Sequence, residues 1–238
     1  MNFKELIKKI NTPAKPLLAV LIDPDKFNPE LIYLANKSKV SCFLVGGSEL
    51  KKGNVTNTIL AIKKISKIPV ILFPGNETQL SKSADGLLLI SLLSGNNPDY
   101  LIGKHITAAP IIKKMNLEYL PTAYLLIDGG TKSTTQKVTK TQPLNPNNKA
   151  VIINTALAAE QLGFKALYLE AGSGAKKSIA PALVKSLKKQ ISIPIIVGGG
   201  IDSVKKVQQV INAGANIVVI GNALEKNVFL VTEIGKCF

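Results

Sequence analysis

The sequence has no tryptophan, one histidine and only two cysteines among 238 residues. Cys42 lies inside an apolar run and Cys237 near the end of the chain, so we expect no disulfide framework and two inert thiols in a reducing compartment. A structural role is predicted for the lone His105, and without a His/Cys cluster no zinc site is expected. The GxGxxG fingerprint of dinucleotide-binding proteins is also missing.

Long hydrophobic runs and acidic residues are scarce as well. No apolar run reaches about 18 residues, so no transmembrane helix is expected. The amphipathic N-terminal stretch lacks the apolar core of a secretory signal, which favours a cytoplasmic location. Basic residues outnumber acidic ones by 30 to 15, giving a net charge of +15. A solvated lysine-rich surface is the simplest interpretation, with attraction to anionic substrates or peripheral association with an anionic membrane as alternatives. Nucleic-acid binding is not expected, because no binding motif accompanies the charge.

Eight short apolar segments rich in β-branched residues recur along the chain, each bounded by Gly, Pro or Asp. They cover residues 17–23, 42–48, 69–75, 86–94, 120–128, 166–174, 194–200 and 216–222. Strands without polar alternation are covered on both faces, which indicates a parallel sheet. Eight such units predict an α/β fold, a single (β/α)₈ TIM-barrel domain over residues 1–238. An open doubly wound sheet is the alternative.

Apolar residues at helical spacing fill most of the connections between these strands. The predicted helices cover residues 28–38, 55–66, 149–163, 180–190 and 203–214. Only ten residues, 76–85, separate the third strand from the fourth, so we expect a modified barrel with one short or degenerate crossover. The longest polar segment, 132–148, follows the fifth strand and is predicted to be a mobile loop or lid over the active-site mouth.

Two neighbouring strands end in glycine and lead into helix-like segments. The seventh ends at Gly199 and Gly200, and the eighth at Gly221 and Asn222. In a barrel these ends lie side by side at the catalytic face, where loops and a helix N-terminus commonly bind phosphate. Glycine lets backbone N–H groups approach an anion without an intervening side chain. We therefore expect one phosphate site shared by the two loops, although ordinary tight turns would give the same pattern.

Two carboxylates also follow predicted strands. Glu170 comes near the end of "YLEAGSG", whose glycines form a loop able to close over a ligand. Asp23 ends the first strand, and Ser48 lies at the corresponding height on the second. A carboxylate with a hydroxyl suits Mg²⁺, which keeps several waters and takes oxygens from a diphosphate. The structural alternatives are a salt bridge for Glu170, an N-cap for Asp23 and a loop hydroxyl for Ser48. This inventory favours displacement at an activated centre over redox chemistry or hydrolysis by a metal pair.

Together these motifs resemble the geranylgeranylglyceryl phosphate synthase family, which includes the heptaprenylglyceryl phosphate synthases. The matching elements are "LIDPDK", "VGGS", "YLEAGSG", "IPIIVGGGI" and "AGANIVVIGNAL", within residues 21–224. The resemblance implies a modified TIM barrel that uses Mg²⁺ to join sn-glycerol 1-phosphate to a polyprenyl diphosphate through an ether bond. Homo-oligomers are usual in that family. Leu21 stands where some bacterial relatives have a basic residue, which favours a geranylgeranyl over a heptaprenyl donor.

The resemblance also implies roles for individual residues. Asp23 and Ser48 would bind the metal, and we expect Asp23 and Glu170 to be catalytic, with Glu170 orienting the glycerol hydroxyls and accepting a proton. The residues expected to hold glycerol phosphate are Tyr168, Leu169, Glu170, Ala171, Gly172, Ser173, Gly174, Gly199, Gly200, Gly221 and Asn222. Apolar residues in "LLLISLLSG" and "YLPTAYLLI" are candidates to line a groove for the prenyl tail.

Two other functions fit part of the pattern. Another phosphate-binding barrel enzyme, of the phosphoribosyl isomerase or thiamine-phosphate synthase type, would share the glycine-ended strands, and Asp128 is a candidate for the second aspartate of an isomerase. A non-enzymatic barrel that holds a phospho-ligand is the other alternative. Metal-dependent formation of an ether product would distinguish the leading prediction from both.

Overall fold

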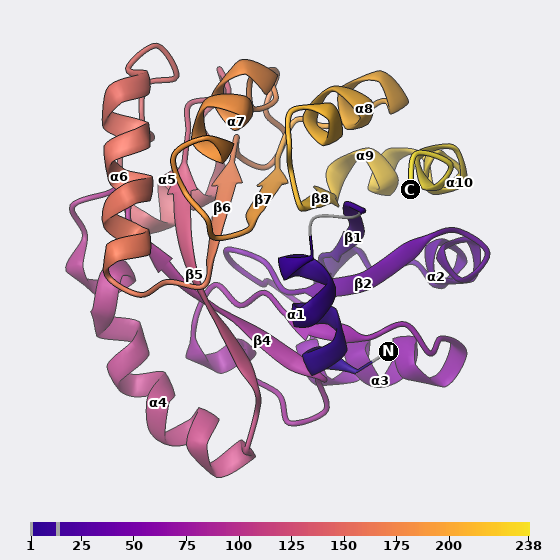
Figure 1. Ribbon diagram of the computed structural model, residues 1–238. Helices are drawn as coiled ribbons and strands as arrows, with labels where there is room; N and C mark the ends of the chain where they lie inside the picture. Colours follow the sequence, from indigo (N-terminus) through magenta and orange to yellow (C-terminus); the bar gives the residue numbers. More distant parts are fainter. Residues whose placement is uncertain (1, 13–14) are drawn as a thin grey trace.

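Eight parallel strands close into a barrel in the order β1 to β8 (Figure 1). The structure is a computed structural model that describes residues 2–12 and 15–238. The strands are β1 (Leu17–Ile22), β2 (Val40–Val45), β3 (Val70–Leu72), β4 (Gly86–Leu92), β5 (Tyr119–Leu126), β6 (Ala166–Glu170), β7 (Ile195–Gly198) and β8 (Ile217–Ile220). The predicted TIM barrel is therefore confirmed and the open sheet is wrong. Met1 and residues 13–14, which the predicted domain includes, lie outside the described residues.

Helices surround the barrel. They are α2 (Pro29–Asn36), α3 (Val55–Ile65), α4 (Lys104–Met115), α6 (Lys149–Gln161), α7 (Pro181–Lys188), α8 (Val204–Asn212), and the short α5 (Thr134–Thr139), α9 (Asn222–Lys226) and α10 (Leu230–Gly235). All five predicted helices are present. The pattern analysis missed α4, which holds a proline in its interior and follows a π-helical turn, η3 (Asp99–Gly103). None of the helices within the described ranges combines the length and apolar character needed to cross a bilayer.

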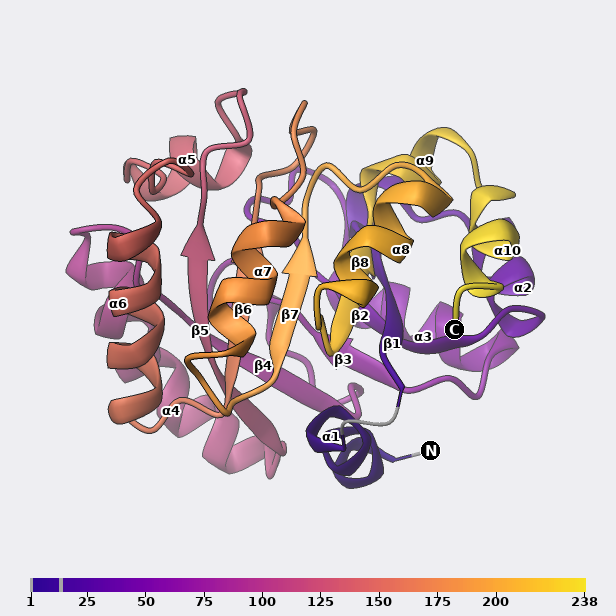
Figure 2. The same ribbon diagram turned by 45° about the horizontal axis from the view of Figure 1, so that its top comes forward.

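The N-terminal helix α1 (Phe3–Asn11) closes the end of the barrel opposite the strands' carboxyl ends (Figure 2). A capping box starts it, because Asn2 accepts a hydrogen bond from the Glu5 backbone and Glu5 accepts one from the Asn2 backbone. Its apolar face buries Phe3, Leu6 and Ile10 against the residues that fill the barrel interior. This end of the barrel is therefore covered, and the loops after the strands' carboxyl ends lie at the opposite end.

The connection from β3 to β4 is a single 3₁₀ turn, η2 (Glu77–Gln79), so the predicted degenerate crossover is confirmed. The buried Gln79 side chain binds the loops after β2 and β3 together. Its amide donates to the Gly47 carbonyl at 2.8 Å and accepts from the backbone N–H groups of Gly47 and Gly75, both at 3.2 Å. The loops are therefore held in place, but no crossover helix covers the outer side of β3 and β4.

The polar segment after β5 has regular structure. Ser133 caps α5 by accepting a hydrogen bond from the Gln136 backbone, and Leu144 pairs with Ile127 in an isolated parallel bridge. The predicted loop is therefore wrong for residues 134–139, where a Ser cap and a run of helix-tolerant polar residues form a short helix. Its position at the mouth is as expected, since Thr135 lies 3.0 Å from Ser48, Oγ1 to Oγ.

Candidate active site

Glu170 is the last residue of β6 and lies at the carboxyl end of the barrel, where the whole residue is only 7% exposed. The Gly172 backbone donates to Oε1 at 2.7 Å. Burial raises the pKa of Glu170 from its ordinary 4.5 to about 7, while the hydrogen bond from Gly172 and the neighbouring Tyr168 hydroxyl oppose the rise. A carboxyl group with this pKa can take up and release a proton near neutral pH, as a general base must.

An aromatic cluster fills the barrel interior below Glu170. Tyr168 stacks on Phe73 at 5.3 Å between ring centroids and lies 5.2 Å from Tyr124. The Tyr168 hydroxyl is fully buried beside the Glu170 carboxylate, and within the described residues it makes no hydrogen bond of ordinary geometry. Burial, with the nearby Glu170 carboxylate, raises the pKa of the Tyr168 hydroxyl well above its usual value, so this hydroxyl stays protonated and can act as a donor.

The remaining predicted residues of β6 and its loop divide into two groups. Leu169 and Ala171 are buried in the outer core between strands and helices, so their side chains do not reach the mouth. Gly172 and Gly174 have left-handed backbone, φ +101° and +71°, and turn the loop back over the strand ends. The side chain of Ser173 and the N–H of Gly174 both point to Asn222 at the end of β8.

Gly199 and Gly200 follow β7 directly, beside β6 and β8. Both have left-handed φ, +80° and +67°, which only glycine adopts without strain. A Cβ on Gly199 would overlap the Glu170 carboxylate, so the Gly199 backbone packs directly against Glu170. In the part of the chain that the structure describes, the N–H groups of Gly199, Gly200, Gly221 and Asn222 donate no hydrogen bond to protein. Four backbone donors are thus available at two adjacent strand ends.

Asp23 follows β1 and is half-buried. Its Oδ1 accepts from the Asp25 backbone at 3.0 Å, so it is the N-cap of the turn η1 (Pro24–Lys26), as the structural alternative expected. Burial raises the pKa of Asp23, and its Oδ2 lies 4.0 Å from Lys26 Nζ. The loop carrying Ser48 runs past it, because a Cβ on Gly47 would lie 3.9 Å from Asp23 Oδ1.

The donor set at Asp23 bears on a metal. Over residues 2–12 and 15–238 there is no group of three or more His, Cys, Asp or Glu side chains able to hold an ion. A cation here would have one carboxylate and one hydroxyl from the protein, and would fill its other positions with water and substrate oxygens. Mg²⁺ is the common biological ion that binds in this way, so Asp23 and Ser48 fit it.

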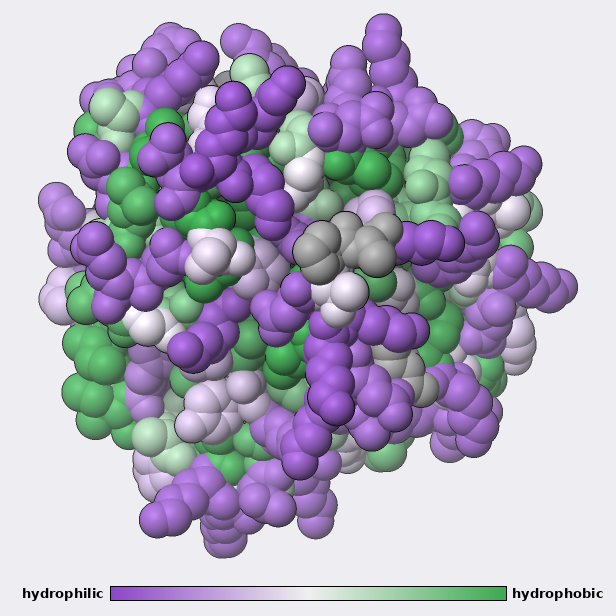
Figure 3. Space-filling view, viewed as in Figure 1, coloured by the Kyte–Doolittle hydropathy of each residue, from purple (hydrophilic) through white to green (hydrophobic). Residues whose placement is uncertain are grey.

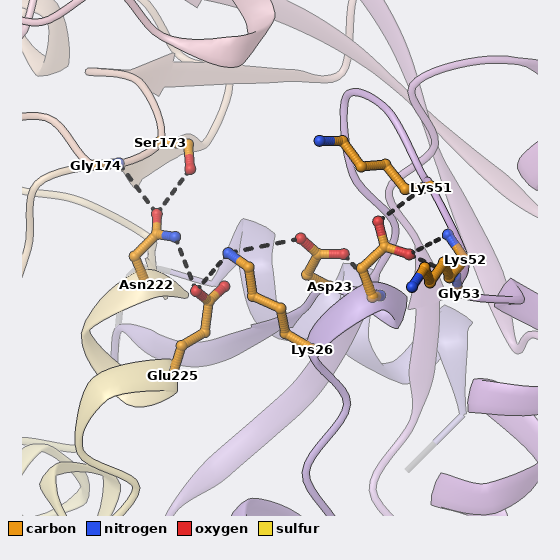
Figure 4. A network of polar contacts seen from close by, with 10 residues as sticks. Asp23, Lys26, Lys51, Lys52, Gly53, Ser173, Gly174, Asn222 and Glu225 are labelled. Atoms are coloured by element: carbon orange, nitrogen blue, oxygen red, sulfur yellow. Dashed lines mark hydrogen bonds and ion pairs between the residues drawn. The ribbon is translucent and has the colours of Figure 1, made fainter.

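A polar network crosses the mouth from β6 to β2 (Figure 4). Asn222 accepts from Ser173 Oγ at 2.9 Å and from the Gly174 N–H at 3.1 Å, and its Nδ2 donates to Glu225 Oε2 at 3.1 Å. The same Glu225 oxygen accepts from Lys26 Nζ at 2.8 Å. The network therefore connects the glycine-containing loops to Asp23.

On its other side Asp23 is supported by Asp25. The Asp25 carboxylate accepts hydrogen bonds from the backbone N–H groups of Lys51, Lys52 and Gly53, which lower its pKa. This carboxylate is engaged with the loop after β2 and with no side chain of the mouth. We therefore regard Asp25 as a structural residue of the mouth.

An apolar groove begins at Ser48 and runs down the outer wall beside β4. The connection between β3 and β4 holds no α-helix that would fill this space, and the free space of the groove is about 860 Å³ including the open mouth. At the mouth it is lined by Gly47, Ser48 and Tyr124, and farther along by strand residues 87–90 and by Ala108 and Ile112 of α4. Most of the "LLLISLLSG" stretch lines this groove, whereas Tyr124 is its one lining residue from "YLPTAYLLI"; that the groove holds a prenyl tail stays a prediction.

Pattern analysis missed several residues of this site. Lys26 stands in the quoted "LIDPDK" motif and Glu225 three residues after Asn222, but only folding brings them within hydrogen-bond distance. The α4 residues gave no signal, because core packing produces the same composition. Asp128 is exposed and accepts from the Gly130 N–H at 2.8 Å in a local turn, which gives no support to an isomerase-type aspartate. His105 lies in the groove wall with Nε2 at 2.7 Å from Ser91 Oγ.

Known proteins resemble the chain over the whole barrel. A sequence model of the PcrB family matches residues 14–236. The chain is 45% identical over 218 residues to geranylgeranylglyceryl phosphate synthase of Flavobacterium johnsoniae, covering 90% of each protein. It is 40% identical over 233 residues to the synthase of Spirosoma linguale, covering 96% of this chain and 94% of the relative. The crystal structure of (S)-3-O-geranylgeranylglyceryl phosphate synthase from Thermoplasma acidophilum in complex with its substrate sn-glycerol-1-phosphate superposes with a TM-score of 0.90 at 29% identity, covering 100% and 98%.

Proposed function

Because the chain belongs to the PcrB family, whose members include the geranylgeranylglyceryl phosphate synthases above, we propose that it catalyses their reaction. The 3-hydroxyl oxygen of sn-glycerol 1-phosphate forms a bond to the first carbon of geranylgeranyl diphosphate. The bond between that carbon and the diphosphate oxygen breaks, and diphosphate leaves with the bonding pair. The hydroxyl proton goes to a base, and the products are geranylgeranylglyceryl phosphate and diphosphate.

The glycerol phosphate site would lie between β6, β7 and β8. Backbone N–H groups of Gly199, Gly200, Gly221 and Asn222 are available to the phosphate, and glycine leaves room for it. The glycerol hydroxyls would lie toward Glu170 and the free Tyr168 hydroxyl. Leu169 and Ala171 would take part through their backbone only, because their side chains pack in the outer core.

The diphosphate site would lie across the mouth, at Asp23 and Ser48. These two residues would hold Mg²⁺, which when bound neutralises the diphosphate and makes it a better leaving group. Lys26, beside Asp23, adds a second positive charge on the same side. With both substrates held in place, bringing the hydroxyl to the allylic carbon in attack geometry is worth up to about 7–11 kcal/mol in favourable cases.

Glu170 would accept the proton of the attacking hydroxyl. Its pKa of about 7 leaves a substantial fraction ionised at neutral pH and makes it a stronger base than an exposed carboxylate. The aromatic cluster below it keeps water away from the barrel interior, so the allylic carbon meets the glycerol oxygen and not a water molecule.

One observation supports this function above the others: the apolar groove starts at Ser48, next to the proposed diphosphate site. A small-molecule isomerase or thiamine-phosphate synthase needs no such groove, whereas a prenyl donor needs an apolar channel that leaves from its diphosphate. A free space of hundreds of Å³ is of the size that ligand pockets usually have.

The test is product formation. Incubation of the full chain with sn-glycerol 1-phosphate, Mg²⁺ and prenyl diphosphates of several lengths should give an ether of the expected mass, with geranylgeranyl diphosphate the best donor. sn-Glycerol 3-phosphate is the matched control and should react far more slowly. Absence of any ether product at every donor length would rule the proposal out.

The cellular setting follows from the substrates. We propose a cytoplasmic, homo-oligomeric enzyme that associates peripherally with anionic membranes, where a prenyl donor and its product partition. Figure 3 shows hydrophilic side chains over much of one face, and the net charge of the chain is +15. Such a charge attracts an anionic bilayer without insertion.

A further inference from the structure

Lys26 is placed between two carboxylates and bonds to only one of them. Its Nζ donates to Glu225 Oε2 at 2.8 Å and lies 4.0 Å from Asp23 Oδ2 (Figure 4). The side chains of Asp23 and Glu225 are 27% and 23% exposed, so both anions are partly shielded from water. Lys26 comes from the loop after β1, and its flexible side chain can reach either carboxylate.

We propose that Glu225 is a positioning residue that holds Lys26 off Asp23, so that the Asp23 carboxylate stays open to the cation of the proposed function. This inference rests on the assignment of Asp23 as the cation-binding carboxylate. It adds a residue that neither the motif comparison nor the substrate sites include, since Glu225 itself reaches neither Asp23 nor the free backbone donors.

The contacts of Glu225 explain how it is fixed. One oxygen, Oε2, accepts from both Lys26 and Asn222. Asn222 cannot turn its amide over, because its Oδ1 already accepts from Ser173 Oγ and the Gly174 N–H. The orientation of Asn222 therefore presents a donor to Glu225, and Glu225 in turn presents its negative charge to Lys26.

Removing the charge of Glu225 changes which carboxylate Lys26 can pair with. A glutamine keeps the size of the side chain and can still accept from Asn222, but it no longer attracts the ammonium group. Asp23 is then the nearest anion, and its Oδ2 needs to approach by about 1 Å for a direct hydrogen bond. A lysine bound to Asp23 competes with a cation for the same oxygen.

A double-mutant cycle separates this competition from a simple loss of negative charge. The probe is Mn²⁺ alone, added to the purified full chain, with the free ion measured by electron paramagnetic resonance. Glu225→Gln should weaken Mn²⁺ binding about tenfold, a difference of about 1.4 kcal/mol. In a Lys26→Met background the same change should cost no more than about twofold, because no ammonium remains to occupy Asp23.

Two results would overturn the inference. One is equal weakening of Mn²⁺ binding by Glu225→Gln with and without Lys26, which would mean that Glu225 acts by charge or folding alone. The other is no weakening at all. Asp23→Asn distinguishes these from a failure of the proposed function: if it binds Mn²⁺ like the unchanged chain, the cation assignment itself is wrong, whatever Glu225 does.

Kinetics supply a second readout. With Glu225→Gln, the Mg²⁺ concentration for half-maximal ether formation should rise, and saturating Mg²⁺ should restore most of kcat. The Glu225→Asp variant keeps the charge on a shorter side chain and should recover part of the Mg²⁺ affinity. A fall in kcat that no Mg²⁺ concentration corrects would contradict the positioning role.

Discussion

Glu170 occupies a buried position, although its proposed role as a base requires the charged form of the carboxylate. Its burial raises the pKa to about 7, because the ionised form loses hydration that the hydrogen bond from Gly172 and the nearby Tyr168 hydroxyl do not replace. The proton-accepting form of the enzyme should therefore be populated only around and above neutral pH.

The first prediction concerns the pH dependence of activity. Below pH 7, kcat/KM for the free enzyme should rise about tenfold per pH unit and then level off, because Glu170 must lose its proton to act as a base. Initial rates at constant ionic strength between pH 5 and 9 measure this. The Glu170→Gln variant should be slow at every pH. Unchanged turnover of this variant would show that Glu170 is not the base.

The second prediction concerns stability. A carboxyl group with a raised pKa binds its proton more tightly in the folded than in the unfolded state, so the free energy of unfolding falls as pH rises from 4.5 to 7. Compared with Glu170→Gln, the unchanged chain should lose about 3 kcal/mol over this window and nothing more above it. Denaturant unfolding of both chains at several pH values checks this. Parallel pH profiles for the two chains would contradict the burial of the charge.

The third prediction concerns Gly199. A side chain there would take a left-handed backbone and overlap Glu170, so Gly199→Ala should displace Glu170, lower activity strongly and cost more than the roughly 1–2 kcal/mol of backbone strain alone. Gly130→Ala is the matched control, since Gly130 also has positive φ, +79°, but has open space around it. Equal effects of the two substitutions on activity would show that Glu170 does not depend on this packing.

At the scale of single residues, the sequence identified what lies at strand ends but not what side chains touch. Asp23, Glu170 and the paired glycines stand out because polar or glycine residues directly follow apolar strands. Lys26 and Glu225 belong to one contact although 199 positions separate them, and no local pattern reports such a pair. Leu169 and Ala171 lie in a motif whose backbone faces the mouth while their side chains alternate away from it.

Among the elements, the missing crossover helix after β3 and the unpredicted helix α4 form the two sides of the groove. The first was predictable, because ten residues are too few for a strand-to-strand helix. The second was not, because α4 turns part of its apolar face to an open groove and contains Pro110, so its pattern is weak. Helix α5 was missed for a similar reason, since it is short and polar.

The fourth prediction tests the groove. Ala108 of α4 lines it, so Ala108→Phe should narrow it and lower kcat/KM for geranylgeranyl diphosphate about tenfold or more, with less effect on a shorter donor such as geranyl diphosphate. Competition between the two donors, followed by product mass, measures the change. Ala109→Phe is the control, because Ala109 is exposed on the same helix. If both variants keep the same donor preference, the tail lies elsewhere.

For the whole molecule, thirty basic residues set the interaction with its surroundings. The fifth prediction is that the chain binds vesicles containing anionic phospholipid, and that this binding weakens between about 0.05 and 0.5 M salt as the charges are screened. Vesicle sedimentation against neutral vesicles is the measurement. Binding that is equal for neutral and anionic vesicles would contradict an electrostatic origin.

Because no α-helix connects β3 to β4, the helical layer around this barrel is incomplete along those two strands. When a prenyl diphosphate is bound, its hydrocarbon chain would fill the groove along β3 and β4. The outer layer of the barrel would then be complete only during turnover. After the ether forms, the prenyl chain of the product has to leave the groove without being exposed to water. Release of the product into a bilayer that lies against the groove would then be easier than release into solution. The neighbouring lipid would thus take part in the catalytic cycle.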